Sequence, residues 1–171
     1  LETTPHGDFE LIYIDNGTPA GEYSWELAST WASGFNRPFK MARFKEGVCL
    51  SRAWNEGISM ASGFRVLICN NDIRFLKSGW LQLMDAALDE KSIGAAGMTA
   101  MSWRNVPFLQ GSLFGFQREV YERVGPFDDR FEFTCEDVDF CKRLQDVGLQ
   151  IKMIDPPLLG EYVFHHEGAT R

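Results

Sequence analysis

Short apolar runs alternate with amphipathic stretches along most of the chain. Arg65–Cys69 (RVLIC) is largely apolar and of strand length, which is typical of a buried strand. Residues 78–88 place Leu81, Met84 and Leu88 on one face at helical spacing, which predicts an amphipathic helix. The same reasoning predicts strands at residues 9–14, 39–44, 65–69, 93–98, 112–116, 151–154 and 162–165, and helices at 23–32, 51–61, 78–88, 118–124 and 136–147.

This alternation of strands and helices predicts an α/β fold with a mostly parallel central sheet flanked by helices. In such sheets, ligands bind beyond the carboxyl ends of the strands. Two predicted strands run into turns rich in acid and amide groups, Asp15-Asn16-Gly17 and Asn70-Asn71-Asp72. We therefore expect Asp15 and Asp72 to end neighbouring parallel strands and to face the same cleft.

Composition narrows the class of protein. The chain has 171 residues, of which 44% are hydrophobic and 24% charged, which fits a single globular domain. A net charge of −7 disfavours general binding to nucleic acid or to anionic membranes, because both depend on basic side chains. An anionic ligand would then need a local source of positive charge, which a metal ion commonly supplies.

The sequence also lacks several familiar signatures. It contains no GxGxxG, no GxxxxGK[ST] and no GxSxG, which disfavours a dinucleotide site, a P-loop and a serine hydrolase elbow. Residues 1–8 lack the features of a signal peptide, and no apolar run reaches the length of a transmembrane segment. The four cysteines show no metal-ligand spacing, so we expect reduced thiols and a cytoplasmic location, at most peripheral at a membrane.

Two acidic positions are candidates for chemistry, each with a simpler alternative. Asp72 follows an apolar strand and would suit a hard cation, although Asn and Asp also stabilise ordinary turns. Asp137 lies in Glu136-Asp137-Val138-Asp139 at a predicted helix start. There it would act as a general base or, with Thr134 as N-cap, complete a variant of the capping box.

Three further positions leave two interpretations open. His165 and His166 follow an apolar strand and would contact a metal or phosphate, or simply close the strand. Asp15 would bond a nucleobase or ribose, or belong to an ordinary turn. Trp103 lies in a polar segment and would stack on a sugar or cover the sheet.

In order along the chain, these segments resemble an inverting family 2 glycosyltransferase of the GT-A fold. FELIYIDNGT resembles the strand that ends in a base-contacting aspartate, and LSRAWNEGISMASGFRVLICNND resembles the stretch that ends in the DXD-like metal motif. LQGSLFGFQREVYERVGPFDDRF, EFTCEDVDFCKRLQDVGLQI and FHHEGAT resemble the motifs that follow, the second of which carries the catalytic base. The resemblance runs from about residue 9 to the last residue.

The resemblance implies transfer of a sugar from a nucleotide-diphosphate donor to an acceptor hydroxyl, with inversion. The acceptor would be a saccharide, a lipid-linked sugar or a protein. Asp137 maps onto the base, and Asp72 with His166 onto a Mg²⁺ or Mn²⁺ site. The implied nucleotide and donor contacts are Asp15, Asn16, Asn55, Asn70, Asn71 and Gly111, with Glu136, His165 and Trp103 as additional candidates.

One family feature is not found in these 171 residues. The family's domain opens with a strand ending in PxYN, whereas this sequence begins at what would be the end of the following helix. We therefore expect residues 1–171 to be one GT-A domain that lacks its first strand. Two rival functions follow: a catalytically inactive sugar- or nucleotide-binding module on this fold, and a sugar-1-phosphate nucleotidyltransferase, whose Gly-rich basic signature is absent.

Helical geometry separates Asp137 from Asp139. Residues 137 and 139 point about 200° apart on a helix, while Val138, Cys141 and Leu144 form an apolar stripe that must face the sheet. Asp139 lies three and four residues before Lys142 and Arg143, which favours an ion pair. We therefore expect Asp137 to be the base.

Overall fold

The computed structural model describes residues 9–132, 134–154 and 156–166. The chain is divided into two compact units. The larger unit draws its described residues from Phe64–Pro126 and Asp137–Arg171, and the smaller unit from Asp8–Gly63 and Phe127–Glu136.

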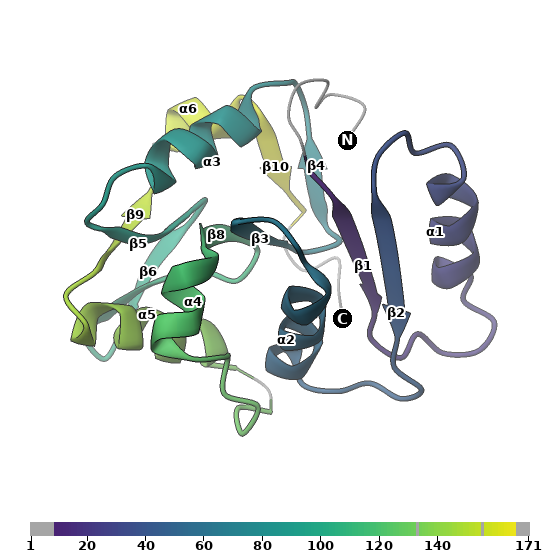
Figure 1. Ribbon diagram of the computed structural model, residues 1–171, viewed down its shortest axis with the longest axis horizontal. Helices are drawn as coiled ribbons and strands as arrows, with labels where there is room; N and C mark the ends of the chain where they lie inside the picture. The colour runs from purple at the N-terminus through teal and green to yellow at the C-terminus, as the bar shows by residue number, and fades with distance from the viewer. Residues whose placement is uncertain (1–8, 133, 155, 167–171) are drawn as a thin grey trace. The chain divides into compact units, whose positions relative to one another are not determined.

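The smaller unit is built on two parallel strands, β1 (Leu11–Asp15) and β2 (Phe39–Arg43), shown side by side in Figure 1. They are connected through α1 (Ser24–Ala32), and α2 (Leu50–Met60) packs on β1. This approach is close, because a Cβ on Gly57 of α2 would lie 3.3 Å from Cγ1 of Ile14.

The larger unit contains a four-stranded sheet in the order β3 (Arg65–Cys69), β8 (Leu113–Gln117), β5 (Ile93–Gly97) and β9 (Gln150–Met153). Around it lie α3 (Trp80–Leu88), α4 (Arg118–Val124) and α5 (Glu136–Asp146). Met84 and Leu88 of α3 and Leu144 of α5 are fully buried, as the predicted helical periodicity requires.

Four short elements of the larger unit were not revealed by the sequence pattern: β4 (Ile73–Phe75), β6 (Ala100–Trp103), β7 (Val106–Leu109) and α6 (Pro156–Gly160). Their neighbour β10 (Val163–His165) corresponds to the strand predicted at residues 162–165. β4 pairs antiparallel with β10, and α6 precedes β10. β6 and β7 form an antiparallel hairpin between β5 and β8. All four are three to five residues long, too short for a clear hydrophobic period.

The α/β class is confirmed, and β3, β5 and β9 run in the same direction, as expected for a mostly parallel sheet, with β8 as the exception. β8 is antiparallel to both β3 and β5, and only β5 and β9 form a parallel pair within this sheet. The cause is the connection into β8, which comes from a hairpin and not from a crossover helix; parallel neighbours require a crossover. In the described part of the chain, no helix has the length and apolar character to cross a membrane.

Candidate functional site

The turn after β3 lies beside the segment that enters β8. Cys69 and Leu113 are the last register pair of the β3–β8 ladder, and beyond it the Asn70 N–H donates to the Ser112 carbonyl at 2.9 Å. The Asn70-Asn71-Asp72 turn and Gly111-Ser112 are therefore held together by backbone hydrogen bonding. Asn70 is half-buried, and Asn71 is exposed at the head of the turn.

Asp137 is fixed to the same segment. Its carboxylate accepts a hydrogen bond from the Gly111 N–H at 3.0 Å and another from the Val138 N–H at 2.8 Å. Burial raises the pKa of Asp137 above the ordinary aspartate value, while these backbone hydrogen bonds act in the opposite direction. The result is a half-buried carboxylate that is anchored on both oxygens. It lies beside Gly111, whose neighbour Ser112 is bonded to the Asn70–Asp72 turn.

Asp72 faces His165 and not His166. The β4–β10 ladder pairs His165 with Ile73, and this register places Nε2 of His165 3.2 Å from Oδ1 of Asp72. Both side chains are largely buried, at 11% and 7% exposure. The backbone N–H of His166 donates to the Asp72 carbonyl at 2.9 Å.

The side chain of His166 is exposed and lies edge-on to the Phe164 ring, with centroids 4.6 Å apart. Neighbouring residues at the end of a strand point to opposite faces, so only one of the two histidines can face Asp72. This geometry favours His165 as the histidine partner of Asp72.

Asp72 and His165 are suitable ligands for a divalent cation whose coordination sphere is completed by a bound substrate. Their oxygen and nitrogen atoms are separated by about the distance expected for adjacent ligands of an octahedral ion with bonds near 2.1 Å, about 3.0 Å. Among the described residues, no group of three or more His, Cys, Asp or Glu side chains is placed to hold a metal. The pair therefore suits a cation that takes its remaining ligands from substrate phosphates and water.

The prediction that Asp139 is held by a basic neighbour is confirmed. The Nε of Arg143 donates to Oδ2 of Asp139 at 2.8 Å, and Lys142 pairs instead with Asp146. Arg143 also donates to the carbonyls of Val124, Gly125 and Pro126 at 2.7, 2.9 and 3.0 Å. Asp139 therefore orients an arginine that ties α5 to the end of α4. Glu136, the other acid of this motif, begins α5 and is 7% exposed.

In the smaller unit, Asp15 is held within its own turn. Its side chain is completely buried, with the Thr18 N–H donating to Oδ1 at 2.9 Å and the Arg43 Nε lying 3.2 Å from Oδ2. Arg43 also donates to the Thr18 carbonyl at 3.0 Å. The sequence analysis did not identify Arg43, although an arginine that ends the next strand is the residue in register with Asp15.

The side-chain amides of Asn16 and Asn55 form hydrogen bonds with the backbone. Each donates its Nδ2 to a carbonyl and accepts an N–H from the same residue, which is Val48 for Asn16 and Phe127 for Asn55, at 2.8–3.0 Å. These paired bonds position the 46–49 loop and the residues around Phe127. The expectation that Asp15 and Asp72 end neighbouring parallel strands is wrong, because β1 pairs with β2 whereas β3 pairs with β8 in a separate sheet. Because the two carboxylates belong to different units, a shared cleft stays a prediction.

The chain has the GT-A glycosyltransferase fold, as its similarity to two solved structures shows. Mannosyltransferase PcManGT from Pyrobaculum calidifontis, solved in complex with GDP-Man and Mn²⁺, matches with a TM-score of 0.77 and 17% identity, over 89% of this chain and 48% of that one. GalNAc-T7, solved with UDP, GalNAc and Mn²⁺, matches with a TM-score of 0.74 and 14% identity, over 93% of this chain and 38% of that one.

The family follows from the sequence comparison. The family model described as glycosyl transferase family 2 matches residues 1–102, and the chain belongs to this family. The O-antigen biosynthesis protein RfbC of Myxococcus xanthus is 23% identical to the chain over 216 aligned residues, which cover 100% of this chain. The chain spans only 16% of the length of that relative.

The structural role of Asp139 and Arg143 leads to a stability prediction. Arg143→Ala removes hydrogen bonds to one carboxylate and three carbonyls, so we expect the free energy of unfolding to fall by about 2 kcal/mol or more. Lys142→Ala is the matched control. Its exposed i,i+4 pair with Asp146 contributes roughly 0.5 kcal/mol at most. Chemical denaturation measures both variants, and equal losses would contradict this role for Arg143.

Proposed function

We propose that the chain is the donor- and base-carrying part of an enzyme that transfers a sugar from a nucleotide-diphosphate sugar to an acceptor hydroxyl, with inversion. The observation that carries the proposal is the half-buried Asp137 carboxylate, anchored by the Gly111 N–H in the segment that adjoins the Asn70–Asp72 turn. Family membership supports glycosyl transfer as the reaction class.

Asp137 is suited to remove the proton from the acceptor. A hydroxyl becomes an effective nucleophile only as its proton leaves, so a carboxylate must accept that proton while the new bond forms. The raised pKa of Asp137 makes its carboxylate a stronger base than an exposed aspartate. The two backbone hydrogen bonds fix the carboxylate, which lowers the cost of orienting it for proton transfer.

Inversion follows if this proton transfer accompanies direct displacement. The acceptor oxygen attacks the anomeric carbon from the face opposite the leaving diphosphate, and the proton passes to Asp137. No covalent sugar–protein intermediate is then needed. Retention by double displacement would instead require a protein nucleophile on the other face of the sugar.

Asp72 and His165 would hold Mn²⁺ or Mg²⁺ against the donor diphosphate. A cation bound there supplies positive charge to a leaving group that an acidic chain would otherwise stabilise poorly. Both similar structures were solved with Mn²⁺, which supports this role. An imidazole ligand favours Mn²⁺ over Mg²⁺, because magnesium prefers oxygen ligands.

The remaining donor contacts divide between direct and supporting roles. Asn70, Asn71 and Gly111 lie in or beside the proposed diphosphate and sugar site; Gly111 is buried and serves through its N–H, which anchors Asp137. Asp15 would contact the nucleoside, and Arg43 would hold the Asp15–Thr18 turn in place. Asn16 and Asn55 would support the site through their hydrogen bonds to the backbone. The name of the O-antigen relative favours a saccharide acceptor, free or lipid-linked, over a protein.

A second function is a binding module that does not catalyse transfer. The observation that favours it is the sparse metal site, with two candidate protein ligands in the described residues. Calorimetry with nucleotide sugars combined with an assay of sugar transfer separates the two functions, since binding without turnover would support the module.

The metal site predicts that nucleotide affinity depends on a cation. We expect GDP or UDP to bind more tightly in Mn²⁺ than in chelator, and His165→Ala to remove most of this difference because it deletes one of two protein ligands. His166→Ala is the matched control, since its side chain lies outside the pair. Isothermal titration measures each affinity. Equal binding in Mn²⁺ and chelator, or loss only in His166→Ala, would contradict this site.

The assignment of the base predicts a selective loss of transfer. Asp137→Asn keeps a side chain that accepts the Gly111 hydrogen bond but cannot take a proton. We expect normal folding and donor binding, with turnover reduced by about 10²–10⁴-fold. Product formation in an active preparation provides the measurement. Near-normal turnover in Asp137→Asn, together with its abolition in Asp139→Asn, would show that the assignment is wrong.

A further inference from the structure

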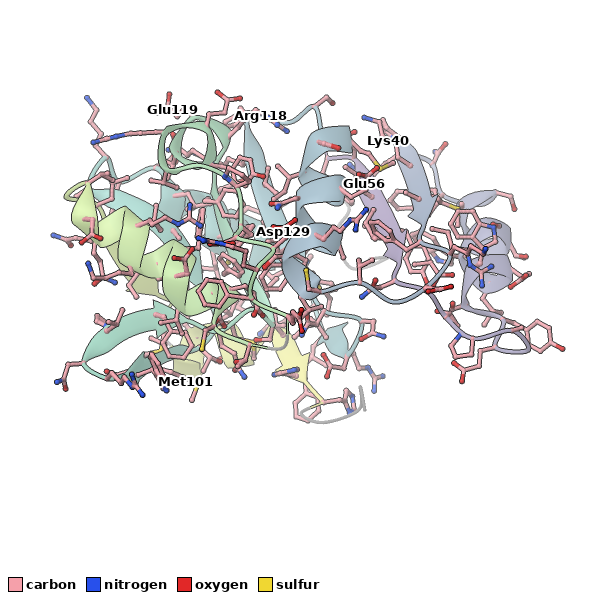
Figure 2. All side chains as sticks on the ribbon, turned by 90° about the horizontal axis from the view of Figure 1, so that it is seen from below. Lys40, Glu56, Met101, Arg118, Glu119 and Asp129 are labelled. Atoms are coloured by element: carbon pink, nitrogen blue, oxygen red, sulfur yellow. The ribbon has the colours of Figure 1, made fainter. Side chains whose placement is uncertain are left out.

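The β6–β7 hairpin presents large apolar side chains to solvent. Met101 and Trp103 are two residues apart on β6 and therefore point to the same face. They remain 50% and 46% exposed, respectively, and Met101 lies at the outer edge of the larger unit (Figure 2). We refer to Met101 and Trp103 as the hairpin platform.

The hairpin is a rigid support for this platform. Arg104 and Asn105 both have positive φ, 47° and 65°, as expected for the tight turn that closes a two-residue hairpin. The guanidinium of Arg104 lies 4.5 Å from the centroid of the Trp103 ring, which restrains the indole. Close to the same turn, the side-chain amide of Gln145 on α5 donates to the Pro107 carbonyl of β7 at 2.7 Å.

The platform is continuous with the proposed active site. The Gln110 N–H donates to the Thr99 carbonyl at 2.9 Å, which closes the base of the hairpin, and the next residue, Gly111, donates to Asp137. The cross-strand partner of Met101 is Phe108, and that of Trp103 is Val106. At about 3.3 Å per residue, these positions lie about 10 and 17 Å along the chain from Gly111.

We propose that the hairpin platform binds the sugar units of a saccharide acceptor that lie behind the one being glycosylated. This inference rests on the proposed function. Trp103 offers a flat apolar surface against which the C–H face of a pyranose packs, and the exposed Asn105 in the adjoining turn supplies groups that bond sugar hydroxyls. The distances from Gly111 match an acceptor of several sugars, with its terminal hydroxyl at Asp137.

Other occupants fit this surface less well. A stable protein interface needs about 800 Å² and 20–30 residues from each partner, whereas the platform offers two large side chains. An anionic membrane is disfavoured by the net charge of −7. The saccharide could be free or carried on a lipid, because the recognition chemistry is the same.

Binding is tested without any need for catalysis. The full chain is labelled with 5-fluorotryptophan, which gives a ¹⁹F resonance for each of its five tryptophans, and Trp103→Phe assigns the resonance of Trp103. Mono- to tetrasaccharides of glucose, galactose, mannose and N-acetylglucosamine are then titrated. Trp31, which is 42% exposed on α1, is the matched internal control.

We expect at least one of the longer saccharides to shift the Trp103 resonance selectively and saturably. No shift at Trp103 with any sugar, or equal shifts at Trp103 and Trp31, would overturn the platform. Because this experiment measures binding alone, it separates failure of the platform from failure of the proposed transfer activity.

Kinetics provide the second test in an active preparation. Trp103→Ala should raise the KM for acceptors of three or more sugars by about three- to tenfold, with little change for a monosaccharide acceptor or for donor hydrolysis by water. Trp103→Phe should recover part of the loss. Tyr23→Ala, which removes another exposed aromatic side chain, is the control and should change neither KM. A Trp103→Ala effect that is equal for short and long acceptors would overturn the proposal.

Discussion

The hydrogen bond from the Gly111 N–H to the Asp137 carboxylate, 3.0 Å long, fixes the arrangement on which the proposed chemistry depends. Gly111 precedes β8, the strand that pairs with both β3 and β5. The same bond therefore sets the position of the helix-borne carboxylate relative to the sheet. Because Ser112 is bonded to Asn70, the Gly111–Asp137 hydrogen bond also fixes the position of the carboxylate relative to the turn that carries Asp72.

The four aspartates of this account differ in what faces them, and this difference assigns their roles. Asp15 faces Arg43, Asp72 faces His165 and Asp139 faces Arg143, whereas Asp137 is held by backbone N–H groups. Burial raises the pKa of Asp137, although its backbone hydrogen bonds act in the opposite direction. Its half-buried carboxylate lies beside the segment bonded to the Asn70–Asp72 turn, which favours it as the proposed acceptor of the proton.

The long elements were predictable because their hydrophobic periods are clear, as in α3, where Met84 and Leu88 reach the core. The Asp139–Arg143 pair was predictable because it depends only on helical spacing. The choice of His165 over His166 was not, because it depends on the register between β10 and a three-residue strand. The antiparallel direction of β8 was missed for a similar reason, since it depends on a hairpin that local pattern does not indicate.

The most direct test of the central claim is the pH dependence of turnover at saturating donor, acceptor and Mn²⁺. A general base must be deprotonated, so turnover should fall as the pH decreases through the pKa of Asp137. Since burial raises that pKa, the account predicts an acid limb whose midpoint lies above the ordinary aspartate value of about 3.9. Turnover that stays constant down to that value would contradict Asp137 as the base.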